Sequence, residues 1–129
     1  MGARTIAGIL DRGPRPALAV LHAQDDPPEL RRWLAANGWH IDAEGLAPEA
    51  GRFAEVIRAV PGEESAEGLW LDYGPRLLTV GDPLLLDHLD QLMAHHENIA
   101  RATDGRDSRV HDDARRRADF LRARVQQWS

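Results

Sequence analysis

The sequence predicts an α/β fold over residues 1–80 and an antiparallel pair of helices over residues 81–129. Two patterns predict the α/β part. A short continuous apolar run at 16–22 is typical of a parallel-type strand covered on both faces, and the alternating residues of 39–60 are typical of a β-hairpin. Apolar residues spaced by four and three from Leu85 onward predict two helices that pack as a coiled coil.

A short helix is expected first, over Ala3–Arg12, and Gly13 and Pro14 end it. The apolar strand Pro16–His22 follows. The stretch "DDPPELRRWLAANG" then predicts a second helix, with Asp25 or Asp26 as its cap and two prolines in its first turn. The residues expected to face inward from this helix are Leu30, Trp33 and Leu34, and Gly38 ends it.

The next segment reads as two strands, "WHIDAEGL" and "RFAEVIRAV", joined by the turn-rich "APEAG". Such a hairpin after a helix and strand adds an antiparallel edge to the sheet. The stretch "PGEESAEG" is expected to be a polar loop, after which Gly74 and Pro75 redirect the chain.

Two long helices complete the chain, and "TDGRDS" joins them, with Gly105 in the turn and Asp107 or Ser108 as the next cap. One set of contact positions lies on each helix. The first set is Leu85, Leu89, Leu92, His96 and Ile99; the second is Val110, Ala114, Arg117 or Ala118, Leu121, Val125 and Trp128.

Composition fits one compact domain, since the chain has 129 residues, of which 43% are hydrophobic. It has neither an apolar run of about eighteen residues nor a signal-peptide pattern, so we expect a cytoplasmic protein with no membrane partner. The absence of cysteine excludes disulfides, thiol nucleophiles and zinc-thiolate sites.

Positive charge gathers towards the C-terminus. Residues 101–129 hold 8 of the 16 arginines against 5 aspartates, whereas residues 1–100 hold 8 arginines against 16 acidic residues. Because the planar guanidinium donates paired hydrogen bonds to phosphate, this run is a candidate RNA-binding surface. Salt bridges to Asp112, Asp113 and Asp119 on a solvated helix face are the alternative. The candidate residues are Arg115, Arg116, Arg117, Arg122 and Arg124.

The order of these elements, and several local stretches, resemble one family along almost the whole chain. The stretches are "MGARTIAGILDRG", "LRRWLAANGWHIDAEGL", "GRFAEVIRAVPGE" and "YGPRLL". The family is the bacterial tRNA N1-adenine methyltransferases of the TrmK type. The resemblance implies that residues 1–80 are the C-terminal part of a Rossmann-like methyltransferase domain, and that residues 81–129 are its coiled-coil extension. It also implies S-adenosylmethionine as cofactor and tRNA as partner.

In this alignment Met1 and Gly2 fall within a glycine-containing cofactor motif in the middle of the catalytic domain. The family's earlier glycine loop and acidic residue have no counterpart in this sequence, so we expect the chain alone to bind the cofactor poorly. The outer edge of the strand at 16–22 would then be exposed, which predicts self-association or docking of a separate cofactor-binding half.

The loop after the buried strand would line the entrance for the adenine, because ligands of open α/β sheets bind at the carboxyl ends of the strands. Here the sequence is "LHAQ" where the family usually has Gln-Pro-Asn after the leucine, and Ala3 replaces a glycine of the first motif. His22 is a candidate proton acceptor, and Gln24 is a candidate hydrogen-bond partner of the adenine edge. An ordinary polar loop is the alternative for both.

Three histidines and a glutamate on the first long helix do not have the spacing of a metal site, so we predict no metal. They are His88, His95, His96 and Glu97. The four tryptophans could stack on bases, but packing in the core and the helix seam is the favoured interpretation. Two functions therefore stay open: the C-terminal half of a tRNA methyltransferase, or a non-catalytic module whose coiled coil binds RNA or protein.

Overall fold

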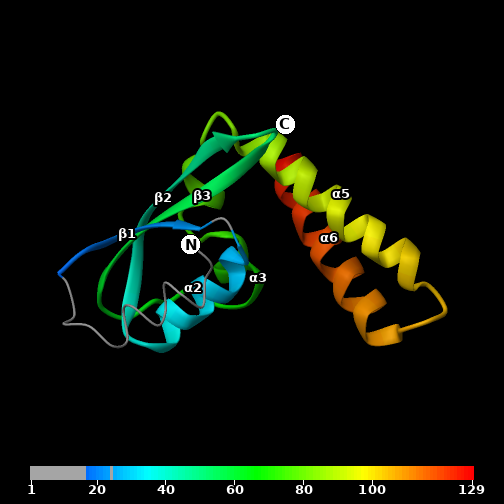
Figure 1. Cartoon of the computed structure of the whole chain (residues 1–129), viewed down its shortest axis with the longest axis horizontal. Coiled ribbons are helices and arrows are strands. Elements are labelled where there is room, and N and C mark those ends of the chain that lie inside the picture. Colours follow the sequence, from blue (N-terminus) through cyan, green and yellow to red (C-terminus); the bar gives the residue numbers. More distant parts are fainter. Residues whose placement is uncertain (1–16, 24) are drawn as a thin grey trace. The chain divides into compact units, whose positions relative to one another are not determined.

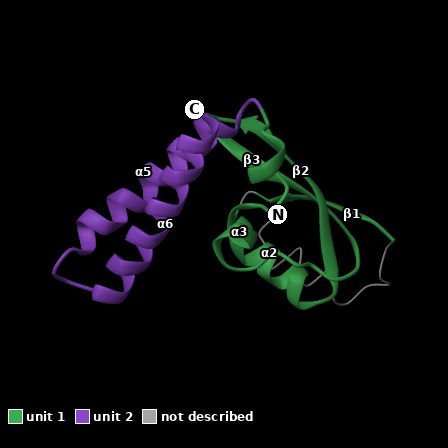
Figure 2. Ribbon diagram, turned by 180° about the vertical axis from the view of Figure 1, so that it is seen from behind, with its two compact units in different colours: residues 1–82 green, residues 83–129 purple. Residues whose placement is uncertain are grey.

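The computed structural model describes residues 17–23 and 25–129. The chain forms two compact units, residues 1–82 and residues 83–129 (Figures 1 and 2). The helix expected over residues 3–12 lies outside the described residues.

The first unit contains a three-stranded sheet and short helices. In chain order they are β1 (Ala19–Ala23), α2 (Pro27–Ala36), β2 (Trp39–Glu49), β3 (Arg52–Pro61), α3 (Gly68–Tyr73) and α4 (Leu77–Val80). The strand order is β1-β3-β2, and β3 is antiparallel to both neighbours. The expected hairpin is present, and its second strand, β3, lies in the middle of the described sheet. As a result, β1 and β2 run parallel to each other and have their carboxyl ends on the same side.

β1 is covered on one face, so the prediction of a strand covered on both faces is wrong for the described residues. Ala19 and Ala23 are buried, whereas Leu18 and Val20 are 48% and 63% exposed. The reason is that the core of this unit forms on one side of β1, where it packs with Leu30 and Leu34 of α2.

The helix α2 begins and ends as the sequence predicts. Asp26 is the N-cap, because its Oδ1 accepts the backbone N–H of Glu29 at 3.2 Å, and prolines occupy the first turn. Leu30 and Leu34 are fully buried, which stabilises the unit by roughly 1.5–3 kcal/mol for each side chain. Gly38 follows the helix with a φ of 78°.

The hairpin between β2 and β3 closes through a two-residue turn, which is tighter than the five-residue connection expected. Ala50 and Gly51 have φ values of 45° and 80°. Positive φ at both central residues is the geometry that fits the right-handed twist of a hairpin, and it costs least when a glycine is present.

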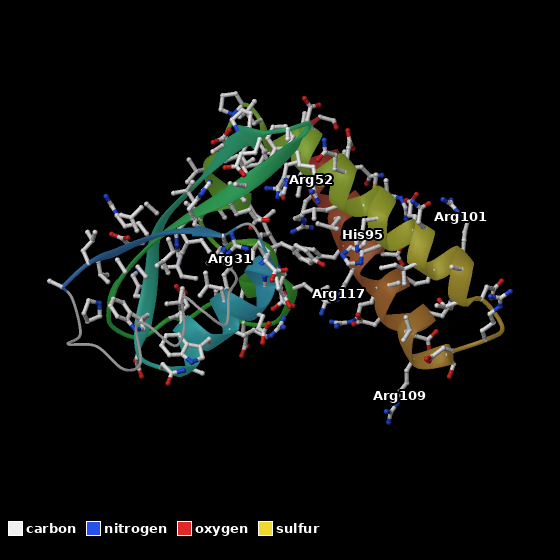
Figure 3. The ribbon with its side chains drawn as sticks, in the orientation of Figure 1. Arg31, Arg52, His95, Arg101, Arg109 and Arg117 are labelled. Atoms are coloured by element: carbon white, nitrogen blue, oxygen red, sulfur yellow. The ribbon has the colours of Figure 1, made fainter. Side chains whose placement is uncertain are left out.

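Arg31 on α2 is buried in the first unit, although arginine side chains usually lie in solvent (Figure 3). Its Nε and Nη2 lie 2.7 and 2.6 Å from Glu44 Oε2, and its Nη1 lies 2.6 Å from Glu55 Oε1. Nη1 also donates to the carbonyl oxygen of Asp72 at 2.9 Å. Burial alone would lower the pKa of Arg31, but the charges of Glu55 and Glu44 raise it above its usual value.

Glu44 extends this arrangement to the start of α4. Its Oε1 accepts the backbone N–H groups of Arg76 and Leu77 at 2.7 and 3.1 Å, and its side chain is fully buried. Gly74, with a φ of 112°, lets the chain pass close by, since a Cβ there would lie 2.8 Å from Leu77 Cβ and 3.0 Å from Glu44 Oε2. We call Arg31, Glu44, Glu55 and these backbone groups the Arg31 cluster.

The expected polar loop after β3 also has a buried acidic side chain. Glu64 Oε1 accepts the N–H of Ile41 at 2.9 Å, and Glu64 Oε2 accepts the N–H of Ala66 at 3.0 Å. The loop is therefore attached to β2 by a carboxylate.

The second unit consists of α5 (Leu85–Thr103) and α6 (Ser108–Trp128), which pack against each other as an antiparallel hairpin. Asp107 caps α6 by accepting the N–H of Val110. Gly105 in the turn has a φ of 71°. Most predicted contact positions are buried or half-buried, but Val110 is 43% exposed, so the tight packing does not reach the first turn of α6. The residues that are fully buried in the contact are Leu85, Leu89, Ala100, Ala114, Ala118 and Leu121.

The Arg31 cluster predicts a large effect for Arg31→Met. This change leaves two buried carboxylates without their cation, and removal of one partner from a buried ion pair costs about 3–5 kcal/mol. Arg58→Met is the matched control, because Arg58 pairs with Asp42 at the surface, where solvent screens the charges and the pair contributes little to stability. Urea unfolding monitored by tryptophan fluorescence measures both. Equal losses of stability in the two variants would contradict the view that the buried ion pairs of Arg31 stabilise this unit.

Candidate functional site

The carboxyl ends of β1 and β2 bring together His22 and Glu49. His22 Nε2 lies 3.1 Å from Glu49 Oε1, and both side chains are close to half exposed. A carboxylate at this distance orients an imidazole. Glu49 also lines a shallow recess of about 190 Å³ at the hairpin turn, beside Arg52 and Phe53. The sequence prediction missed Glu49, since nothing in the local pattern links it to a histidine 27 residues earlier.

The other predicted residues of this site are not described by the structure. Gln24, Met1 and Gly2 lie outside the described residues. In the described part of the chain, the connection from β1 to α2 includes Asp25 and Asp26 and has no glycine. The described residues therefore lack the glycine loop that holds a nucleotide cofactor at the start of a helix, and we assign them no cofactor contact.

Three of the five candidate RNA-binding arginines on α6 are engaged in surface ion pairs. Arg116 Nη2 and Arg117 Nε lie 3.0 and 2.9 Å from the two oxygens of Asp113. These arginines help to lower the pKa of Asp113, which desolvation by itself would raise. Arg122 lies 2.7 Å from Glu97 of α5 and 2.9 Å from Asp119.

The remaining two arginines differ from these. The guanidinium of Arg124 lies 5.1 Å from the ring centre of Phe120, a cation–π contact. Arg115 is exposed and lines a recess of about 370 Å³ between α5 and α6, together with Arg101 and His111. The ion-pair alternative from the sequence thus holds for Arg116, Arg117 and Arg122.

The histidines of α5 do not form a metal site in the described part of the chain, where no cluster of three or more metal-ligating side chains occurs. His88 is buried, and the rings of His95 and His96 meet edge to face with centres 5.2 Å apart. Desolvation lowers the pKa of His96 to about 4, with contributions from His95 and Arg117.

Packing of the tryptophans, which the sequence favours over base stacking, is seen for part of the set. Trp39 is buried in the core of the first unit, and Trp33 packs against that core. Trp128 is half-buried on α6, whereas Trp70 on α3 is 38% exposed.

A model of the tRNA (adenine(22)-N(1))-methyltransferase family, TrmK, matches residues 1–127. The chain belongs to the TrmK family. No curated protein matches the sequence in a direct search.

Solved structures agree on the fold. A Streptococcus agalactiae protein of the NADB-Rossmann superfamily matches 97% of this chain with a TM-score of 0.85 and 21% identity, and the match covers 56% of its own length. The TrmK of B. subtilis, an M1A22 tRNA methyltransferase, matches 97% with a TM-score of 0.78 and 20% identity over 60% of its length. TrmK of M. capricolum, solved with S-adenosyl-homocysteine, matches 97% with a TM-score of 0.77 and 15% identity over 56% of its length.

These likenesses show a Rossmann-like α/β fold for this TrmK-family chain. The chain spans a little over half the length of the solved relatives that it matches. Among the described residues, no helix is both long enough and apolar enough to cross a membrane.

The low pKa of His96 predicts that acid weakens the folded state. Between pH 6.5, the ordinary value, and about 4, the unfolded chain binds a proton at His96 that the folded chain does not, so stability falls as pH falls through this window. Because the side chain is only half-buried, we expect a loss of about 1 kcal/mol.

Urea unfolding at about pH 7.5, above this window, and at about pH 4.5, near its lower end, measures the effect. His96→Gln should lose less stability on acidification than the unmodified protein. Ala94→Gln, an exposed change on the same helix, should retain the original pH dependence. If His96→Gln keeps the pH dependence of the unmodified protein, then the low pKa of His96 is not the cause of that dependence.

Proposed function

We propose that this chain takes part in S-adenosylmethionine-dependent methylation of N1 of an adenine in tRNA. The observation that carries the proposal is the family match over residues 1–127. The parallel ends of β1 and β2 support it, because they hold His22 and Glu49 at the sheet edge where open α/β folds bind their ligands.

The residues of this edge have distinct proposed roles. When N1 takes the methyl group, S-adenosylhomocysteine would leave and the adenine would become positively charged; His22 would accept a proton from the exocyclic amino group of that cation. Glu49 acts through His22 as a positioning residue, and its negative charge favours the cationic base. Gln24, by its place in the sequence, hydrogen-bonds the adenine edge. Met1 and Gly2 are the proposed cofactor contacts, on the family resemblance alone.

The free edge of β1 is the proposed docking position for the cofactor-binding part of the enzyme. Within the described residues, β1 pairs only with β3, so its other backbone edge has no described partner strand, and Val20 and Leu18 are exposed on the uncovered face. An exposed apolar strand edge readily pairs with another strand. A second copy of this chain is the alternative occupant, and sedimentation of the chain alone tests it.

A chimera tests the catalytic proposal. It joins this chain behind the part of B. subtilis TrmK that the chain does not cover, and the product is measured as N1-methyladenosine by mass spectrometry of digested tRNA. We expect methylation, a loss of about 100-fold in kcat/KM for His22→Ala, and a loss of about tenfold for Glu49→Gln. The KM for S-adenosylmethionine should not change, since neither residue is assigned a cofactor contact.

Glu63→Gln, in an exposed part of the loop after β3, is the matched control and should keep full activity. Calorimetry with S-adenosylmethionine shows whether the chimera has folded. A chimera that binds the cofactor yet forms no N1-methyladenosine would contradict the catalytic proposal. If the chain nevertheless binds tRNA, the non-catalytic module is the better description.

A further inference from the structure

Charge is unevenly distributed along the helical hairpin of α5 and α6. Residues 101–117, which surround the turn, contain six arginines and four aspartates. Residues 83–100, which form most of α5, contain three acidic residues and no arginine. The end of the hairpin that contains the turn is therefore its positive end.

The arginines near the turn also differ from those farther along α6 in what they contact. Arg122 has two carboxylates within 3 Å of its guanidinium, so an approaching phosphate would meet net negative charge there. Arg106, Arg109 and Arg115 make no ion pair with any residue that the structure describes, and Arg101 bonds only to the neutral amide of Asn98. We call Arg101, Arg106, Arg109 and Arg115 the open arginines.

Arg109 is placed where it does not help the helix. It lies in the first turn of α6, and the N-terminal end of a helix dipole repels a cation. Asp107 next to it serves as the cap, its Oδ1 accepting the N–H of Val110 at 3.2 Å. Arg109 therefore destabilises its own helix and has no ion-pair partner among the described residues. Contact with an anion outside the chain would offset this unfavourable charge.

Arg101 and Arg115 face a common space. Both line the recess of about 370 Å³ between α5 and α6, where His111 Nδ1 is hydrogen-bonded to the carbonyl oxygen of Ala100 at 2.8 Å. The paired Arg122 lines the same recess, with the carboxylates of Glu97, Asp104 and Asp119. Arg101 and Arg109 point outward from the helices on different sides (Figure 3). The open arginines thus surround the turn end of the hairpin.

We propose that the open arginines, and not the paired arginine Arg122, bind the phosphates of tRNA at the turn end of the hairpin. This inference rests on the proposed function for its RNA partner. It changes the sequence-based candidate set, because it adds Arg101, Arg106 and Arg109, keeps Arg115, and removes Arg122. Exposed guanidinium groups that make no ion pair within the described residues suit phosphate contacts that position a nucleic acid without reading its sequence.

Binding of a fluorescent tRNA transcript to the 129-residue chain, measured by anisotropy at several salt concentrations, tests the proposal. Two double variants are compared with the unmodified chain: Arg106→Ala with Arg109→Ala, and Arg101→Ala with Arg115→Ala. Each should weaken binding by about tenfold and lower the slope of log affinity against log salt by about one to two. Arg122→Ala, the matched control, should change affinity by less than about twofold.

A thermal melt separates binding from folding. Arg109→Ala should melt at the same temperature as the unmodified chain or higher, since it removes an unfavourable charge. If tRNA binds and Arg122→Ala weakens it as much as the double variants do, the assignment to the open arginines is wrong. If the unmodified chain shows no salt-dependent binding even at about 50 mM salt, the tRNA partner of the proposed function fails with it.

Discussion

The guanidinium of Arg31 is removed from water, so its charge depends on the two carboxylates beside it. Glu44 comes from β2 and Glu55 from β3, while the carbonyl oxygen of Asp72 belongs to α3. The second oxygen of Glu44 in turn holds the backbone at the start of α4. Because a buried charge is tolerated only when its partners are in place, these separate elements must adopt one arrangement together.

That arrangement positions the proposed active edge of the sheet. With β3 inserted between them, β1 and β2 run parallel, and Glu49 at the end of β2 reaches His22 near the end of β1. The hairpin unit is held by different forces, mainly small and aliphatic side chains such as Ala114, Ala118 and Leu121. Its surface is therefore available for charge, and the arginines near its turn follow from that freedom.

The sequence predicted those features that depend on local patterns. The cap at Asp26, the inward leucines of α2 and the spacing of the two long helices all arise within a few residues of each other. It did not predict the burial of Arg31, because the partners lie 13 and 24 residues away and the helix pattern alone places an arginine in solvent. For the same reason the contact of His22 with Glu49, the central place of β3 and the exposed face of β1 became evident only in the structure.

Hydrogen exchange of individual backbone amides, followed by NMR, tests the central role of the Arg31 cluster most directly. The N–H groups of Arg76 and Leu77 lie at the start of a four-residue helix, where amides normally exchange quickly. Since both donate to the buried carboxylate of Glu44, we predict that they exchange only when the whole unit unfolds, at the same free energy as Ile57 in the core. Exchange at the rate of an exposed loop would show that the cluster does not hold the unit together.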